Sequence, residues 1–128
     1  MSEFEELIEC CGEQAKNMGW WDDFPGDIHM VRTTGQLTSE QHNWITTKLF
    51  LVTSELVESH DEIRNGKGLF ELYYDEKNKP QGFPTEIADA FIRLMDMCYN
   101  LNIPLIEFIN LKLTYNASRG ARHGGKVS

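Results

Sequence analysis

The chain lacks any long apolar run. No hydrophobic stretch approaches the length of about 18 residues that a membrane-spanning helix requires. The N-terminus, MSEFEELIECC, is acidic, whereas the start of a secretory signal peptide is basic. These two absences predict a soluble cytoplasmic protein that does not associate with membranes.

Positive charge is scarce as well. The 128 residues include 12 lysines and arginines against 20 aspartates and glutamates, so the formal net charge is −8. Because so acidic a surface repels the phosphates of nucleic acids, we expect no general nucleic-acid binding.

The chain has few cysteines and no pattern typical of iron or zinc sites. Its three cysteines are odd in number and form no C-x-x-C pair, so we expect reduced thiols without a disulfide or zinc site. Ferritin-like di-iron bundles require Glu-x-x-His. The residues three positions before the four histidines are Gly26, Ser39, Val57 and Gly120, so that motif is absent. The pair His60–Asp61 matches only a fragment of a metal phosphohydrolase signature.

Apolar residues at helical spacing predict four helices. These cover Ser2 to Asn17, about Ser39 to Asn65, Pro84 to about Asn100, and a segment that begins at Pro104. Their apolar stripes are Phe4, Leu7, Ile8, Cys11 and Ala15; Ile45, Leu49, Val52, Leu56 and Ile63; Ile87, Phe91, Leu94, Cys98 and Leu101; and Leu105, Phe108, Leu111 and Tyr115. Residues 20–36 are expected to be an irregular aromatic loop that folds back on the protein, and residues 66–83 a loop with a short extended piece at LFELYY.

This pattern predicts an all-α fold, a four-helix bundle, in a single domain of residues 1–128. Residues 1–40 would be the N-terminal helix and the aromatic loop, residues 41–118 the helical core with the metal site, and residues 119–128 a basic, glycine-rich tail. Stripes this apolar in so short a chain would leave a face uncovered, and a second copy could cover it.

Two pairs of acidic residues border the predicted core. Glu55 and Glu58 lie three residues apart on the second predicted helix, and Glu86 and Asp89 on the third. Residues at this spacing share a helix face. Helical geometry places Lys48, Glu55 and Glu58 beside one apolar stripe, and Asp89, Arg93 and Asp96 continue the row of Glu86 beside the other.

Clustered carboxylates in a shared cleft would repel one another unless a cation joined them. Oxygen ligands alone favour hard ions such as magnesium, calcium or manganese. A purely structural, solvated acidic face is the alternative interpretation. For the acidic pairs of the first helix, the helix dipole is a sufficient explanation.

Acidic residues are absent from Leu111 to the C-terminus. That stretch contains Lys112, Arg119, Arg122, His123 and Lys126. Lysines and arginines bind polyphosphates, and glycines let a backbone approach them closely. Carboxylates for a metal together with bases for phosphates indicate nucleotide phosphoryl chemistry, although a flexible C-terminus would explain the tail equally well.

These motifs resemble the all-α nucleoside triphosphate pyrophosphohydrolases, the MazG-like group. The family motif E-x-x-E, a loop, then E-x-x-D is matched by ELVE at residues 55–58 and EIAD at residues 86–89. The stretches KPQGFPTEIADAFIRLMD and KLTYNASRGARHGGK are similar to the corresponding parts of that family. The resemblance covers about Trp44 to Lys126, and the 27 residues between the pairs are at the long end of the family range.

The resemblance implies hydrolysis of a nucleoside triphosphate, NTP or dNTP, to the monophosphate and pyrophosphate. It implies Mg²⁺, with Mn²⁺ as a substitute, and assembly as a homodimer or homotetramer. The implied catalytic and metal-binding residues are Glu55, Glu58, Glu86 and Asp89, with Glu58 orienting or deprotonating the attacking water. The implied phosphate contacts are Lys48, Arg93, Lys112, Asn116, Arg119 and Lys126, with Arg122 and His123 as further candidates.

The nucleobase would need an aromatic partner. The candidates for stacking are Trp44, on the carboxylate stripe, and Trp20, Trp21 and Phe24, in the irregular loop. A core role for these aromatic residues is the alternative. A non-catalytic helical protein that binds a partner through its acidic face and basic tail remains the alternative for the protein as a whole.

Overall fold

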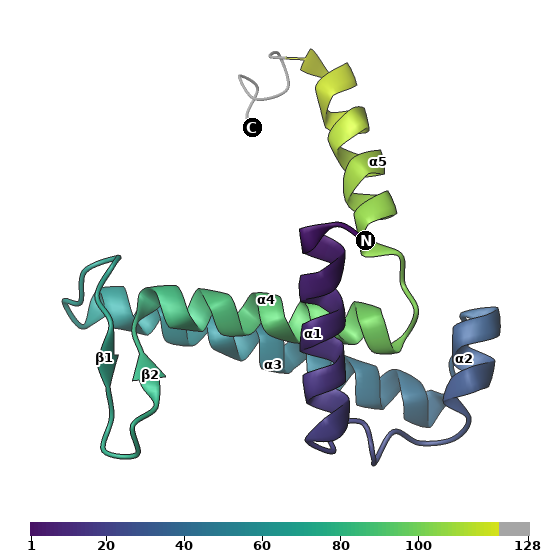
Figure 1. The fold of residues 1–128 in the computed structure, drawn as a ribbon, viewed down its shortest axis with the longest axis horizontal. Coiled ribbons are helices and arrows are strands. Elements are labelled where there is room, and N and C mark those ends of the chain that lie inside the picture. Colours follow the sequence, from purple (N-terminus) through teal and green to yellow (C-terminus); the bar gives the residue numbers. More distant parts are fainter. Residues whose placement is uncertain (121–128) are drawn as a thin grey trace.

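Residues 1–120 of the computed structural model are described here, and they are mostly helical (Figure 1). Within this range the elements are α1 (Glu3–Asn17), α2 (Ile28–Thr34), α3 (Ser39–Arg64), β1 (Tyr73–Tyr74), β2 (Pro80–Gln81), α4 (Phe83–Asn100) and α5 (Leu105–Ser118). The predicted all-α class is confirmed. None of the helices in this range is long and apolar enough to cross a membrane.

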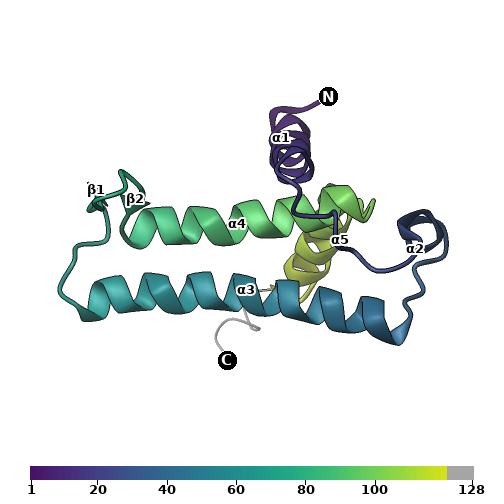
Figure 2. The same ribbon diagram turned by 90° about the horizontal axis from the view of Figure 1, so that it is seen from below.

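The centre of the fold is an antiparallel pair of long helices, α3 and α4 (Figure 2). A small hairpin joins them, with β1 and β2 paired antiparallel and Tyr73 opposite Gln81. The sequence predicted an extended piece at LFELYY, and its last two residues form β1; the second strand was not predicted. Because the connection turns the chain back on itself, the first turns of α4 lie beside the second half of α3.

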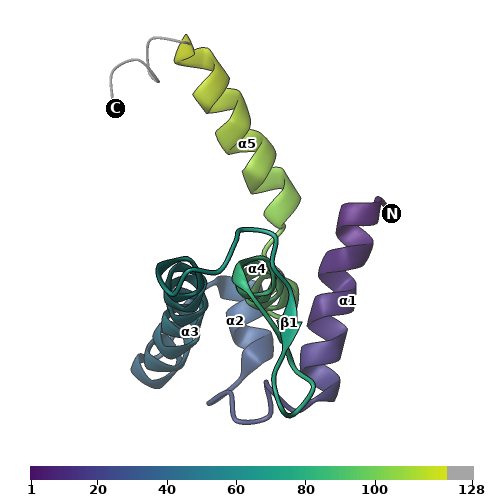
Figure 3. The same ribbon diagram turned by 90° about the vertical axis from the view of Figure 1, so that its left-hand side faces the viewer.

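Helix α1 packs on α4, on the side opposite α3 (Figure 3). The contact is close because Gly12 has no side chain and the ring of Tyr99 lies directly against it. The Asn100 Nδ2 amide donates to the Gly12 carbonyl over 3.1 Å. The buried apolar residues are small or flexible, namely Cys11, Ala15, Val31, Val52, Ala90, Met95 and Met97.

Local signals explain where the long helices begin. Ser2 and Thr38 each form a capping box with the side chain three residues later, Glu5 and Gln41. Pro84 lies in the first turn of α4, where a missing N–H costs nothing. The predicted limits of these helices agree with the structure to within about one residue.

The aromatic loop is more ordered than the sequence suggested. Residues 28–34 form helix α2, which the prediction of an irregular segment missed. The Asp27 side chain caps its start, and Gly35 ends it in the left-handed conformation, with φ of 71°. The helix is short and buries only Val31, so no apolar period marks it.

Helix α5 forms where it was predicted, but it projects away from the other helices (Figures 1 and 3). It buries no residue. The predicted stripes of the other helices are also partly uncovered: Val52 is buried, whereas Leu49, Leu56 and Ile63 are exposed, as is Phe91, at 59%. The described part of one chain therefore does not close a four-helix bundle.

Replacing Gly12 with alanine should destabilise the fold. A methyl group there would overlap the Tyr99 ring, so α1 must move off α4, which should lower the free energy of unfolding by about 1–3 kcal/mol. Urea denaturation measures this change. Gly68→Ala is the control, since a Cβ at Gly68 meets no atom within 4 Å. Equal stability of the two variants would contradict the close α1–α4 contact.

Candidate metal centre and adjoining cavity

Three carboxylates meet where α3 and α4 pack together. Each of Glu55, Glu86 and Asp89 offers one oxygen, and these oxygens all lie within 4.8 Å of one another. Glu55 lies in the middle of α3, while Glu86 and Asp89 lie one turn apart at the start of α4. The antiparallel arrangement of the two helices therefore creates the cluster.

Glu86 is the most deeply buried member of this cluster. Its side chain is only 2% exposed, and its Oε1 atom has no hydrogen-bond partner among the described residues. Burial, together with the nearby charges of Glu58, Asp89 and Glu55, raises the pKa of Glu86 from 4.5 to about 7. Burial and the Glu55 charge also raise the pKa of Asp89. The carboxylates are thus held together against their mutual repulsion.

This environment fits a hard divalent cation. A buried carboxylate oxygen without a donor is costly, and a cation would satisfy it. Since all the available ligand atoms are oxygens, Mg²⁺ or Mn²⁺ suits the cluster better than a softer metal. The three carboxylates that could hold the ion are Glu55, Glu86 and Asp89.

Glu58 is placed differently from the other three predicted ligands. It is exposed on α3 and is not a member of the 4.8 Å cluster. Its charge nevertheless contributes to the raised pKa of Glu86, so it lies close to that carboxylate. The structure thus brings three of the four predicted ligands together, with Glu58 on the solvent side.

Arg93 links the carboxylates to a neighbouring cavity. Its Nε donates to Glu55 Oε2 over 2.9 Å. Its guanidinium carbon lies 5.9 Å from the centre of the Trp20 ring, and the residue lines the cavity on that side. Arg93, a predicted phosphate contact, therefore lies next to the carboxylate cluster.

The cavity has a volume of about 430 Å³ and lies between the turn after α1 and the helices α3 and α4. Its lining residues are Gly19, Trp20, Trp21, Asp22, Asp23, Lys48, Arg93, Asp96 and Met97. Two of the predicted base-binding residues, Trp20 and Trp21, line it. Lys48, a predicted phosphate contact, lines it too.

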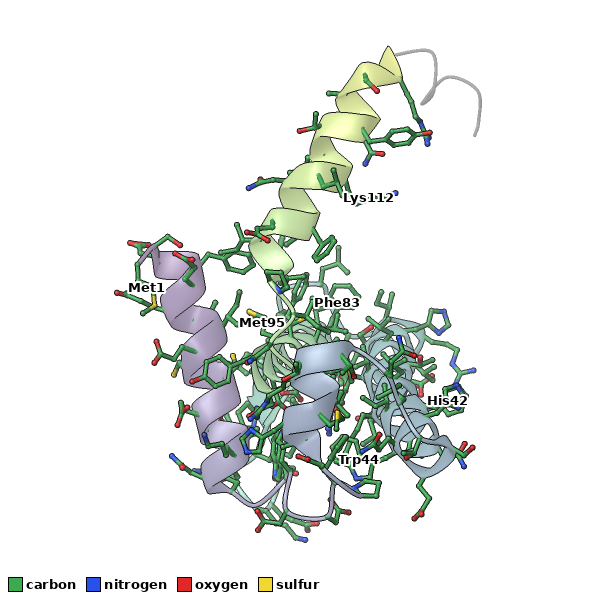
Figure 4. The ribbon with its side chains drawn as sticks, turned by 90° about the vertical axis from the view of Figure 1, so that its right-hand side faces the viewer. Met1, His42, Trp44, Phe83, Met95 and Lys112 are labelled. Atoms are coloured by element: carbon green, nitrogen blue, oxygen red, sulfur yellow. The ribbon has the colours of Figure 1, made fainter. Side chains whose placement is uncertain are left out.

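Trp44, the third tryptophan candidate, packs against the aromatic residues of the loop and does not line the cavity. The Trp44 ring packs 4.8 Å from Trp21 and 5.0 Å from Phe24, measured between ring centres, and Lys48 Nζ lies 4.6 Å from the centre of its ring (Figure 4). The predicted return of the aromatic loop onto the protein is confirmed. Trp44 supports the cavity from outside, because it is not among the lining residues.

Asp96 is a cavity residue that the sequence did not single out as a site. It continues the row of Glu86, Asp89 and Arg93 on α4, so the signal was present in the sequence. The sequence could not show the hydrogen-bond partner of Asp96. The Trp21 indole N–H donates to Asp96 Oδ1 over 2.7 Å, although the two residues are 75 positions apart in the chain.

The remaining predicted phosphate contacts do not reach the cluster within one chain. Lys112 and Asn116 lie on α5, and Arg119 directly follows its last residue; this helix leads away from the carboxylates (Figure 4). Lys112 and Arg119 instead lie over the ring of Tyr115 on the same helix. Lys126, Arg122 and His123 fall outside the described residues.

Comparison of the chain with protein-family models, with curated proteins and with solved structures finds no match. The resemblance of the motif residues to MazG-like enzymes therefore stays a prediction from the sequence.

Raising the pH should destabilise the metal-free protein. The folded state holds the Glu86 proton more tightly than the unfolded state does, so this contribution to stability is complete below pH 4.5 and is lost as the pH rises through about 7. In EDTA, the urea midpoint should fall between pH 5.5 and 8, and Glu86→Gln should reduce that fall. Glu40→Gln, an exposed change on α3, is the control and should keep it. An unchanged pH dependence in Glu86→Gln would show that Glu86 is not the responsible group.

Proposed function

We propose that this protein hydrolyses a nucleoside triphosphate, NTP or dNTP, to the monophosphate and pyrophosphate in a Mg²⁺-dependent reaction. The observation that carries the proposal is the buried Glu86 oxygen beside Glu55 and Asp89, which has no hydrogen-bond partner within residues 1–120. A solvated acidic face would leave its carboxylates in water, whereas Glu86 is almost completely buried. The motif resemblance and the adjoining cavity support the choice of a nucleotide as substrate.

In the proposed reaction, water attacks the α-phosphorus, the bond from this phosphorus to the bridging oxygen breaks, and pyrophosphate leaves. Bound Mg²⁺ would neutralise phosphate charge and lower the pKa of the attacking water. Glu58, on the solvent side of the cluster, would orient that water and accept its proton. Arg93 and Lys48 would bind phosphate oxygens and stabilise the charge that develops on them.

Purified protein should convert members of a dNTP and NTP panel to monophosphate and pyrophosphate with Mg²⁺, and EDTA should abolish the activity. Glu86→Gln or Asp89→Asn should lower kcat/KM by on the order of 10²-fold or more, which is about 3 kcal/mol of transition-state stabilisation. Ion chromatography distinguishes pyrophosphate from phosphate as the product.

Glu40→Gln is again the control and should keep full activity. Wild-type protein that is inert on every nucleotide and shows no saturable Mg²⁺ binding by calorimetry would favour the non-catalytic, partner-binding alternative. Release of phosphate without pyrophosphate would instead indicate a different phosphohydrolase.

The uncovered apolar surface supports assembly into a homodimer or homotetramer. Phe50 on α3 is 67% exposed, Leu111 on α5 is 62% exposed, and Phe91 on α4 is exposed as well. Apolar surface of this extent is typical of an interface. A second copy that packed on α3 and α5 would complete a helical bundle.

Assembly would also explain the position of the basic residues on α5. From Asp89 to the end of α4 the chain rises about 16 Å, and α5 then leads further away, so Lys112 and Arg119 are remote from the carboxylates of their own chain. In an oligomer these cations would contact the phosphates of a nucleotide bound by the neighbouring copy. Each site would then be composed of two chains.

Mixing two inactive variants should therefore restore activity. We expect Glu86→Gln and the double variant Lys112→Ala, Arg119→Ala to be inactive alone, and an equimolar mixture to recover up to about one quarter of wild-type activity in a dimer. Light scattering should show an oligomer in each sample. A monomer, or a mixture that stays inactive after subunit exchange, would rule out the composite site.

A further inference from the structure

Asp96 presents an unused acceptor to the cavity. Its side chain is 8% exposed, and its Oδ1 atom accepts hydrogen bonds from the Trp21 indole and from Asn100 Nδ2, each over 2.7 Å. Both bonds end on Oδ1, which leaves Oδ2 without a hydrogen-bond partner among residues 1–120. Because Asp96 lines the cavity, this oxygen is available to a ligand there.

Two hydrogen bonds hold the Asp96 carboxylate in place, and no cation forms an ion pair with it within residues 1–120. Burial raises the pKa of Asp96, and the hydrogen bonds from Trp21 and Asn100 offset part of this rise. The charges of Lys48 and Arg93, which also line the cavity, offset a smaller part. In the described part of the chain, neither cation forms an ion pair with Asp96. The two N–H donors on Oδ1 favour the ionised carboxylate. The cavity thus combines a fixed acceptor with two donors.

The rest of the cavity suits a planar ring. Trp20 and Trp21 supply aromatic surface on one side, and the volume of about 430 Å³ is within the range of small-molecule sites. Asp89 and Asp96 lie seven residues apart on α4, which corresponds to about 10 Å along the helix, with Arg93 between them. A nucleoside could therefore lie along α4, with its phosphates at the carboxylate cluster and its base at Asp96.

We propose that this cavity binds the nucleobase and that Asp96 selects guanine. The inference rests on the proposed function, because it assigns the base specificity of that site. Guanine places a ring N–H and an amino group side by side, so both can donate to Oδ2 as a shared acceptor.

The other bases cannot offer two adjacent N–H donors to Oδ2 of Asp96. Adenine and cytosine place a ring acceptor beside the amino group, and that acceptor would face the carboxylate. Uracil and thymine offer one N–H between two carbonyl oxygens. A buried polar group left without a partner discriminates strongly against the wrong ligand.

The test is Asp96→Asn, which keeps the shape of the side chain. The asparagine oxygen can still accept from Trp21 and Asn100, while the free acceptor becomes an N–H donor. Calorimetry without metal, using GMP, AMP, CMP and UMP, separates base recognition from hydrolysis. Wild-type protein should bind GMP at least ten times more tightly than UMP, and Asp96→Asn should lower that ratio about tenfold or more.

Glu40→Gln is the control: it also replaces a carboxylate with an amide, but Glu40 is exposed on α3 and does not line the cavity, so the base ratio should stay unchanged. Equal binding of the four monophosphates by the wild type, or an unchanged ratio in Asp96→Asn with a native unfolding midpoint, would overturn the proposal. A ratio that falls as much in Glu40→Gln would also overturn it.

A parallel triphosphate panel distinguishes this inference from the proposed function. Hydrolysis of all bases at similar kcat/KM would refute guanine selection and leave the pyrophosphohydrolase intact. Selective GMP binding by a protein that hydrolyses nothing would support the base site and refute the hydrolase.

Discussion

The burial of the Glu86 carboxylate between α3 and α4 is the constraint on which the site depends. Glu86 is only 2% exposed, and one of its oxygens lacks a hydrogen-bond partner in the described residues. Oxygens of two further carboxylates lie within 4.8 Å. Burying a carboxylate in such surroundings opposes folding. Contacts elsewhere on α3 and α4 keep Glu86 buried. The α1–α4 contact at Gly12 and the capped start of α3 are two of these contacts. Their stabilisation of the fold offsets the unfavourable free energy of the cluster.

The same packing relates the cluster to the cavity. Arg93 binds Glu55 on one side and lines the cavity on the other, and Asp96 follows one turn later on α4. Helix α4 therefore carries, in a single row, one or more of the groups proposed for metal, for phosphate and for base, and Glu55 of α3 completes the carboxylate cluster. This arrangement would let a chain of 128 residues hold the proposed nucleotide with few side chains.

The aromatic loop after α1 supplies the aromatic rings of the cavity. The Trp21 indole is held by Asp96 and packs against Trp44, so the turn is anchored to both α3 and α4. Its rings form the cavity wall, and its short helix α2 ends before α3 begins. Residues 1–120 of one chain leave apolar surface of α3 and α5 uncovered, which is why the proposal places a second copy there.

The sequence by itself determined the helical class, the limits of the long helices and the two acidic pairs, because capping residues, apolar period and i, i+3 spacing are local properties. It also indicated Arg93 and the aromatic candidates. Only the tertiary structure decided that Glu55, Glu86 and Asp89 converge while Glu58 stays exposed, that Trp21 binds Asp96, and that α5 leaves the helix pair. These facts depend on contacts between residues distant in the chain, and helical periodicity alone does not specify which faces meet.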